Sequence, residues 1–329
     1  MEMRSDIAMT SRVTSKPAEW RDYLALMKPR VMSLVVFTAF AGYVAAPVSI
    51  HPVMAAISIF ALALGAGAAG ALNMAYDADI DLKMRRTRLR PVPLGKVRAE
   101  DAYGFGLVAA ALAIVLMTLA ANFLAAGLLA FSIFFYAVIY TMLLKRRTPQ
   151  NIVIGGAAGA FPPMIGWVVA TGSISVDAVI LFAIILLWTP PHSWALALYK
   201  SGDYEDAGVP MMPVAKGAKR TRLEMLVYSL LLTPFALAPV FTGLGGILYG
   251  VVAALGGVLF LVLAFRIYNS RAGEAGSAEE GALYAVRAGD KAARDLFAYS
   301  IGYLTALFAA LIAEHSMGAY YGFSLGGLF

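Results

Sequence analysis

Long apolar stretches alternate with shorter polar connections along most of this 329-residue chain. Nine of these stretches are long enough to cross a membrane as helices, since a spanning helix needs about 20 mostly apolar residues. They fall at roughly 31–48, 53–76, 102–120, 123–144, 152–171, 177–199, 224–243, 248–266 and 298–315. The pattern therefore predicts an all-α polytopic membrane protein with nine transmembrane helices.

The composition agrees with a membrane protein. Hydrophobic residues make up 60% of the chain and charged residues only 14%, too few to cover the surface of a soluble domain of this size. The chain contains no cysteine, so it can form neither disulfides nor cysteine-ligated metal sites.

The placement of the basic residues predicts the orientation. All 26 Lys and Arg residues lie before the first stretch or in alternate connections, and the connections near 45–52, 121–123, 172–176 and 244–247 contain none. Cytoplasmic loops of membrane proteins are enriched in Lys and Arg, so we expect a cytoplasmic N-terminus and an outside C-terminus. This topology accounts for the net charge of +6, and no nucleic acid is expected as a partner.

The same pattern divides the chain into one intramembrane domain, 23–316, and two tails. The tail at 1–22 is expected in the cytoplasm; it carries acidic residues and has no apolar core, so it is not a signal peptide. The short tail at 317–329 is expected on the outer side. Two long polar loops, about 77–101 and 200–223, lie on the predicted cytoplasmic side and are the expected catalytic loops.

Three oxygen-bearing side chains are spaced four residues apart where the first loop begins: Asn73, Asp77 and Asp81. In a helix this spacing puts them on one face. Two carboxylates on one face repel each other unless a cation lies between them. Mg²⁺ suits that position, because it takes oxygen ligands and is often completed by the phosphates of a substrate. The alternative is a solvated helix end, where the acids simply face water. Under either interpretation, Pro91 and Pro93 are expected to end the helix.

Basic residues close to these acids are candidates for binding a diphosphate. Lys83 and Arg88 follow the acids in sequence, and Arg147 precedes the fifth apolar stretch. Asn151 begins that stretch, and the N-terminus of a helix favours anions. For the cluster around Arg147, membrane topology alone is the alternative explanation of the charge.

The sixth apolar stretch contains two adjacent prolines, Pro190 and Pro191, followed by His192. Prolines remove backbone donors and predict a break in the helix, which is tolerated where a helix lines a cavity. Polar residues at membrane depth are functional candidates. We therefore expect His192, flanked by Trp188 and Trp194, to contact a flat aromatic or metal-bearing substrate. The alternative is a packed, hydrogen-bonded histidine in a kinked helix.

A second acidic loop follows this stretch and contains Lys200, Asp203 and Tyr204. It lies on the same predicted side of the membrane as the first, so the two loops could bind a metal–diphosphate complex from both ends. Such a site supports the ionisation of an allylic diphosphate, in which Mg²⁺ and cationic side chains stabilise the departing pyrophosphate.

At these residues the chain resembles the UbiA superfamily of intramembrane prenyltransferases, whose first signature, Asn-x₃-Asp-x₃-Asp, matches Asn73, Asp77 and Asp81. The run Trp188-Thr-Pro-Pro-His192-x-Trp194 is more specific and resembles the branch that farnesylates heme. The likeness extends over residues 22–213, through Lys28-Pro29-Arg30, Thr87-Arg88-x-Arg90-Pro91, Arg147-Thr148-Pro149-Gln150-Asn151 and Asp203-Tyr204.

The resemblance implies a nine-helix bundle around a central cavity that opens to the cytoplasmic side of a bacterial inner membrane. It implies Mg²⁺ as cofactor, farnesyl diphosphate and heme B as substrates, and heme O as product. Asp77, Asp81 and Asp203 would be catalytic and would bind the metal, with Asn73 as a supporting ligand. The chain departs from the superfamily after Asp203, because Ala207 stands where a second Asp is usual.

The remaining candidates receive substrate-binding roles from the same resemblance. Those expected to bind the diphosphate are Lys83, Arg88, Arg147 and Asn151. Those expected to bind the substrates around the second loop and the sixth stretch are Trp188, His192, Trp194, Lys200 and Tyr204. Association with a heme A synthase or a terminal oxidase is suggested by analogy alone.

Three other functions stay open at this point. One is a prenyltransferase of the same superfamily that acts on a quinone precursor or chlorophyllide. Another is a membrane transporter, because broken helices with intramembrane polar residues also mark substrate paths. The third is a heme-binding chaperone without catalysis.

Overall fold

The computed structural model describes residues 18–274 and 288–318, and all regular structure within these residues is helical. The predicted tails, 1–22 and 317–329, lie almost wholly outside the described residues. The elements follow the chain in the order α1 (Trp20–Leu26), α2 (Pro29–Val44), α3 (Pro52–Tyr76), α4 (Ala78–Lys83), α5 (Ala99–Ala120), α6 (Phe123–Phe134), η1 (Phe135–Leu144), α7 (Asn151–Thr171), α8 (Val176–Tyr199), α9 (Ser201–Asp206), α10 (Met212–Lys216), α11 (Ala218–Phe235), α12 (Ala238–Thr242), α13 (Ile247–Tyr268), η2 (Ala288–Asp290) and α14 (Lys291–Met317).

The predicted all-α membrane fold is confirmed. In the described part of the chain, eight helical segments are long and apolar enough to cross a membrane, and α1 with α2 would add a ninth if this bent pair is one span. The two helices meet at 54°. Lys28 lies between them with φ of 53°, a left-handed conformation that side chains other than glycine rarely adopt, and Pro29 then begins α2. The count of nine stays a prediction that depends on this first span.

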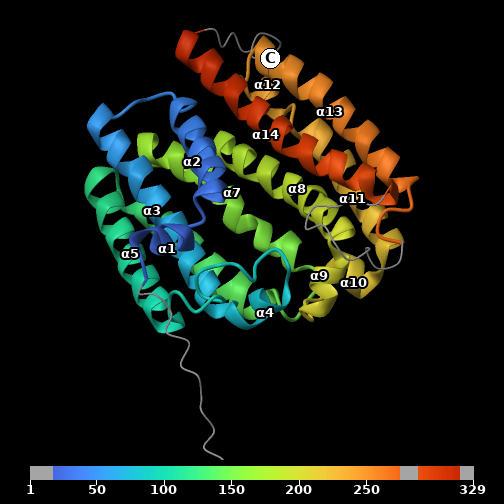
Figure 1. Ribbon diagram of the computed structural model, residues 1–329. Coiled ribbons are helices and arrows are strands. Elements are labelled where there is room, and N and C mark those ends of the chain that lie inside the picture. Colours follow the sequence, from blue (N-terminus) through green and yellow to red (C-terminus); the bar gives the residue numbers. More distant parts are fainter. Residues whose placement is uncertain (1–17, 275–287, 319–329) are drawn as a thin grey trace, which may run out of the picture.

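The long helices form one bundle in which α7 runs through the middle (Figure 1). The helix packs against α2 on one side and α8 on the other, and it is the most deeply buried candidate span. Glycines allow the close approach of α2 and α7. A Cβ atom on Gly42 would lie 2.0 Å from the carbonyl oxygen of Pro163, and one on Gly166 would lie 1.9 Å from that of Ala39. Small residues thus bring the backbones into direct contact.

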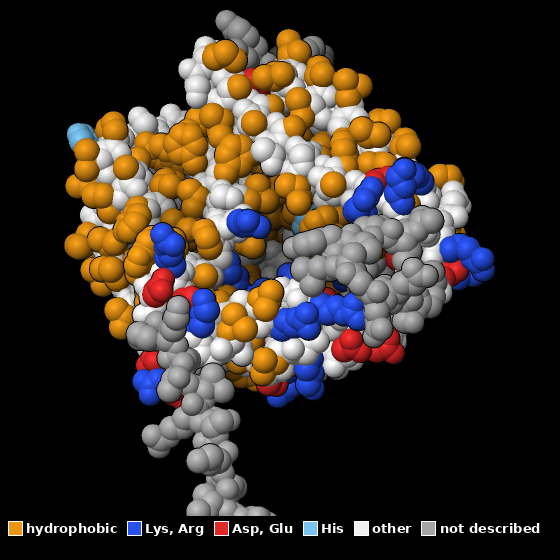
Figure 2. Space-filling model, viewed as in Figure 1, with side chains coloured by type: hydrophobic (Ala, Val, Ile, Leu, Met, Phe, Trp, Pro, Cys, Tyr) orange, Lys and Arg blue, Asp and Glu red, His pale blue; other side chains and the backbone are white. Residues whose placement is uncertain are grey.

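Charged residues gather at one end of the bundle, where α4, α9 and α10 lie (Figures 1 and 2). The rest of the face seen in Figure 2 is mostly apolar, as expected for a surface in contact with lipid. The polar loops that the sequence predicts on the cytoplasmic side therefore share one end of the molecule. We refer to this end as the charged end.

A single buried carboxylate organises part of the opposite end. Glu314 of α14 is 2% exposed, and it accepts hydrogen bonds from the backbone N–H groups of Gly246 at 2.7 Å and Tyr249 at 3.0 Å. The first N–H groups of a helix have no partner within the helix, so Glu314 caps α13 from a neighbouring helix. This acid has a structural role that its position in the sequence does not reveal.

The contact between α2 and α7 predicts a large stability difference between two identical substitutions. Gly166→Ala places a methyl group into the α2 backbone and should destabilise the fold by roughly 1–3 kcal/mol, the usual cost of overpacking. Gly127→Ala on α6, where a Cβ meets nothing within 4 Å, should leave the melting temperature unchanged or raise it. Thermal unfolding of both variants in detergent measures the difference. Equal melting temperatures would contradict the packing described here.

Candidate active site

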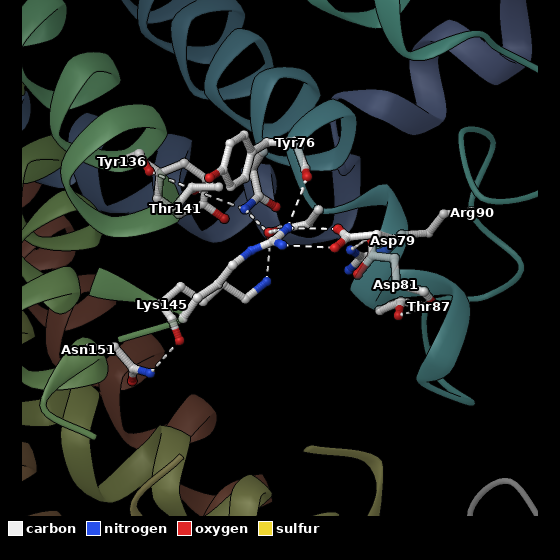
Figure 3. A network of polar contacts seen from close by, with 12 residues as sticks. Tyr76, Asp79, Asp81, Thr87, Arg90, Tyr136, Thr141, Lys145 and Asn151 are labelled. Carbon is white, nitrogen blue, oxygen red and sulfur yellow. Dashed lines mark hydrogen bonds and ion pairs between the residues drawn. The ribbon is translucent and has the colours of Figure 1, made fainter. Parts of the chain in front are cut away.

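Polar side chains from three segments meet at the charged end (Figure 3). They come from the end of α3 with α4 and the loop that follows, from η1 with the residues after it, and from the junction of α1 and α2. Those at the centre of the network, Asn73, Asp77, Asp81 and Thr141, are buried, so each needs a partner. The contacts can be followed atom by atom.

Asn73 lies at the centre of the network and is 3% exposed. Its Oδ1 accepts a hydrogen bond from Lys28 Nζ at 2.5 Å. Its Nδ2 donates to Asp77 Oδ2 at 2.8 Å and to Thr141 Oγ1 at 3.0 Å. The orientation of this amide is fixed, because its oxygen faces the Lys28 ammonium and its nitrogen faces the Asp77 carboxylate.

Asp77 has no exposed surface and is neutralised by the segment that follows η1. Its Oδ2 accepts a hydrogen bond from Lys145 Nζ at 2.5 Å, and its Oδ1 lies 3.5 Å from Arg146 Nη2. A buried carboxylate without such partners would be strongly unfavourable. The network therefore ties the end of α3 to the end of η1.

Asp81 is 1% exposed and has a different cation. Arg90 Nη1 donates to Asp81 Oδ2 at 2.6 Å, and the Thr87 hydroxyl donates to the backbone carbonyl of Asp81 at 2.9 Å. The loop after α4 thus folds back onto α4. Arg90 is part of the motif noted in the sequence, but the spacing alone does not single it out from its basic neighbours.

Asp79 lies at the edge of the site and is mostly exposed. Both of its oxygens bind Arg146, at 2.7 and 2.8 Å, and this hydrogen bonding lowers the pKa of the Asp79 carboxyl. Arg146 also donates to the carbonyl of Tyr76 at 3.1 Å and lies over the Tyr76 ring. Asp79 thereby fixes an arginine that also approaches Asp77.

The local helix differs from the expectation. α3 ends at Tyr76, Asp77 lies between α3 and α4, and α4 ends at Lys83, well before the prolines that the sequence suggested as the end. Asn73 and Asp77 still face each other because Asp77 N bonds to Asn73 O at 2.9 Å, as in a helix. Lysine and arginine side chains pair with Asp77 and Asp81 in this structure.

The segment η1 is π-helical, with backbone hydrogen bonds to the carbonyl five residues earlier, as from Lys145 N to Tyr140 O at 2.8 Å. The Thr141 hydroxyl also donates to Tyr136 O, five residues back, at 2.7 Å. π-helical turns are rare and occur frequently at functional sites. Here the register directs Thr141 and Lys145 toward Asn73 and Asp77.

The second acidic loop packs against the first, as expected. Tyr204 of α9 is buried in an apolar cluster with Ile80 and Met84, which places α9 beside α4. Within the described residues, however, no three Asp, Glu or His side chains lie close enough to hold a metal ion. Asp203 therefore does not join Asp77 and Asp81 here, because α9 is anchored through Tyr204 while Asp203 stays partly exposed.

The basic residues at the acids are not those that the sequence singled out. Lys83, Arg88 and Arg147 are exposed, and no ion pair of theirs is seen in the described part of the chain. The cations that contact the network are Lys28, Arg90, Lys145 and Arg146. Lys28 is partly buried and has a left-handed backbone, a strained conformation of the kind that clusters at functional sites.

Asn151 is fully buried, but its amide nitrogen is occupied, since Nδ2 donates to the Lys145 carbonyl at 3.2 Å. Its Oδ1 is buried without a hydrogen-bond partner among the described residues. This atom can accept from a donor such as a bound water. An anion-binding role for Asn151 stays a prediction.

Lys200, another residue predicted to bind substrate, lies over the ring of Tyr199, at 5.7 Å from its centroid.

The helix that carries His192 continues through Pro190 and Pro191, so the expected break is wrong. His192 is stacked between Trp188, at 4.1 Å between ring centroids, and Phe297 of α14, at 4.7 Å. Trp194 has a different environment. It is completely buried and packs edge-on against Tyr228 of α11, so in this structure it belongs to the core.

An apolar cavity of about 150 Å³ adjoins the polar network. Lys28 and Tyr136 line it together with residues of α2, α3, α6 and α7, and nearly all of its other lining residues are apolar or small, among them Val31, Leu62 and Ile133. The cavity thus extends from the Lys28 side chain into the apolar interior of the bundle.

The fold and the site define an integral membrane protein with a buried acid–base network beside an apolar cavity, an arrangement suited to a ligand with a charged head and an apolar tail. The model of the UbiA prenyltransferase family matches residues 34–280, so the chain belongs to this family.

Two curated relatives are similar over nearly their whole length. A protoheme IX farnesyltransferase of Maricaulis maris (strain MCS10) is 76% identical over 300 residues, which is 91% of each chain. A protoheme IX farnesyltransferase of Caulobacter vibrioides is 58% identical over 325 residues, which is 96% of this chain and 98% of the relative.

Two solved structures have the same fold at low sequence identity. One, from work on a digeranylgeranylglyceryl phosphate synthase, aligns with a TM-score of 0.71 at 18% identity and covers 90% of this chain and 98% of that one. The other is a UbiA homolog from Archaeoglobus fulgidus bound to GPP and Mg²⁺, with a TM-score of 0.60 at 15% identity, covering 88% of this chain and 99% of that one.

The π-helical register of η1 predicts a specific effect of a deletion. Removing Leu143, which is exposed, shortens η1 by one residue and favours α-helical hydrogen bonding, so that Lys145 turns away from Asp77. Misplacing a site residue by about 1 Å can cost roughly 100-fold in rate, and we expect a loss of prenyl transfer of this order.

Leu143→Ala, which keeps the chain length, is the matched control and should retain most activity. Turnover of both variants, compared at equal amounts of folded protein, measures the effect. Equal activity in the two variants would show that the register of η1 is unimportant.

Proposed function

We propose that this protein transfers the farnesyl group of farnesyl diphosphate to a vinyl group of heme B, producing heme O. The observation that carries the proposal is the 76% identity, over nearly the whole chain, to a relative named protoheme IX farnesyltransferase. The site supports it with a charged region for a diphosphate, an apolar cavity for a prenyl chain and an aromatic stack for a flat ring. Each part can be assigned to particular residues.

The cavity is the proposed site of the farnesyl chain. Its walls are apolar, so an isoprenoid tail gains the free energy of leaving water as it enters. Lys28 marks the end of the cavity that adjoins the acids, where a diphosphate group would lie. The amphiphilic shape of the substrate thus matches the change from charged to apolar surroundings.

The donor atoms of the site fit Mg²⁺. Two buried carboxylates, Asp77 and Asp81, and the amide oxygen of Asn73 are hard oxygen ligands, and diphosphate oxygens and water would complete the coordination. Asp203 on the adjoining loop is proposed as a further ligand. When bound, the ion would supply positive charge that stabilises the leaving diphosphate.

The basic residues of the network are proposed to bind the diphosphate itself. Lys145 and Arg146 lie beside Asp77, and Arg90 lies beside Asp81. Each is therefore held where it can pair with a diphosphate oxygen in place of a carboxylate oxygen. Fixed cations of this kind favour the breaking of the C–O bond, because they stabilise charge that develops in the transition state. Lys83, Arg88 and Arg147 remain candidates for attracting the substrate from solution.

The acceptor step then follows from ordinary chemistry. The vinyl π electrons of heme form a C–C bond to C1 of the farnesyl group as its bond to the diphosphate breaks. Water adds to the resulting cation beside the porphyrin ring and loses a proton to solvent, which gives a hydroxyethylfarnesyl side chain. The apolar walls of the cavity keep water from capturing the farnesyl cation before the vinyl group does. Trp188, His192 and Tyr204 are proposed to hold the porphyrin near this point.

The charged end is proposed to face the cytoplasm of a bacterial inner membrane, with the N-terminus inside and the C-terminus outside. Heme B and farnesyl diphosphate would then enter from the cytoplasmic side. Association with a heme A synthase or a terminal oxidase remains a suggestion from analogy. A quinone precursor or chlorophyllide as acceptor is the main alternative within the family, and the assay below separates them.

A membrane assay with heme B, farnesyl diphosphate and Mg²⁺ tests the proposal. Mass spectrometry of the extracted hemes should reveal a product heavier than heme B by one farnesyl group plus water. Substitution of heme by 4-hydroxybenzoate should give no prenylated product. Unchanged heme from verified folded protein, or prenylated 4-hydroxybenzoate, would overturn the proposal.

In the same assay, Asp77→Asn should lower turnover by at least about 100-fold, because the neutral amide loses both the charge that binds the metal and the ion pair with Lys145. Asp101→Asn is the matched control, since Asp101 is partly exposed and, within the described residues, its ion pair is with Arg98, the residue that precedes α5. That variant should keep the activity of the unaltered protein. Normal turnover of Asp77→Asn would refute the metal assignment.

A further inference from the structure

We infer that Ser300 fixes the tautomer of His192, so that the unprotonated Nε2 of this histidine is presented to the iron of the heme substrate. The inference rests on the proposed function for the identity of that substrate. It assigns a positioning role to Ser300, a residue of α14 that lies far from the motifs in sequence.

The geometry comes from two helices. The imidazole of His192 on α8 is stacked between the rings of Trp188 and Phe297, with interplanar angles of 16° and 22°. Its Nδ1 lies 2.7 Å from the Ser300 hydroxyl oxygen. The Trp188 ring also donates, through Nε1, to the backbone carbonyl of Ser300 at 2.8 Å. Ser300 therefore contacts both Trp188 and His192 of α8 and is itself completely buried.

The hydrogen atoms can be counted. The Ser300 hydroxyl has one proton, and its oxygen lies 2.7 Å from the Phe297 carbonyl, which can only accept. When the hydroxyl donates to that carbonyl, it can only accept from His192. His192 must then carry its proton on Nδ1 and donate it to Ser300. In the neutral imidazole, Nε2 is left with a free lone pair.

The neutral form of the ring is favoured by its surroundings. Aromatic rings cover both faces, and no carboxylate contacts His192 among the described residues. Burial without an opposite charge disfavours the imidazolium ion. The lone pair on Nε2 is thus maintained rather than lost to protonation.

This proton count distinguishes two ways of holding heme. A propionate is an acceptor and needs a donor, which an unprotonated Nε2 is not. An iron atom needs a lone pair, which Nε2 offers, and histidine ligands of metals commonly donate their other ring N–H to a fixed partner in this manner. The geometry therefore favours the iron over a propionate.

Access to Nε2 is consistent with this role. His192 is partly exposed although both ring faces are covered and its Nδ1 edge meets the buried Ser300. By elimination, we assign the exposed part of the ring to the edge that carries Nε2. No hydrogen bond to Nε2 is found in the described residues.

Resonance Raman spectroscopy of the purified protein with ferrous heme B tests the inference, because the iron–histidine stretching band reports both the ligand and the hydrogen bond at its Nδ1. The unaltered protein should show this band. It should vanish in His192→Ala and return when free imidazole is added. In Ser300→Ala the band should shift, and the heme dissociation constant should rise about tenfold, since loss of such a partner usually costs at least that much.

Ser58→Ala is the matched control, because Ser58 is equally buried but donates only within its own helix, to Met54. Its band and heme affinity should match those of the unaltered protein. Absence of the band from the unaltered complex, or an unshifted band in folded Ser300→Ala, would overturn the inference. If the unaltered protein converts heme B to heme O but shows no such band, the inference fails while the proposed function stands.

Discussion

The buried carboxylates of Asp77 and Asp81 must be neutralised, and the architecture of the charged end depends on this constraint. Neither residue has more than 1% of its surface exposed, so each carboxylate requires a cation within reach. Asp77 finds Lys145 beyond η1, and Asp81 finds Arg90 in the loop after α4. Two ion pairs thereby determine where η1 and the loop lie relative to α3.

Two backbone irregularities make these contacts possible. Lys28 adopts a left-handed conformation at the junction of α1 and α2, from which its ammonium reaches Asn73. η1 winds as a π-helix, which aligns Thr141 and Lys145 with the same amide and with Asp77. Each irregularity costs free energy relative to regular structure, and each lies at the polar network. The two energetically costly backbone conformations thus both lie at the network of charged side chains.

The fold was largely predictable from sequence, whereas the partners within the site were not. Apolar periodicity and length identify the spanning helices to within a few residues, because the bilayer imposes both. The motif of Asn73, Asp77 and Asp81 identifies the acids. The cations that pair with these acids could not be identified in this way: Arg90 lies among six other basic residues in the segment 83–98, and only the folded loop selects it.

The same limit explains why the predictions for the sixth apolar stretch differ from the structure. Pro190 and Pro191 suggested a break, but a helix packed on several sides can lose two backbone donors and continue, as α8 does. Trp194 shares a motif with His192 yet points into the core against Tyr228. Phe297 and Ser300 carry no signal in the sequence, since their role depends on how α14 packs against α8.

The central helix α7 connects the polar network with the aromatic stack. Its adjacent glycines face opposite neighbours: a Cβ on Gly155 would lie 2.2 Å from the ring of Tyr140 in η1, and one on Gly156 would lie 2.9 Å from Thr189 in α8. Tyr140 precedes the segment that binds Asp77, and Thr189 adjoins Trp188 of the stack. The lack of side chains at these two positions therefore sets how closely η1 and α8 approach α7. The proposed transfer, from a diphosphate near η1 to a ring near α8, would require that spacing to be fixed, and glycine in a packed helix fixes it by direct contact with the neighbouring side chains.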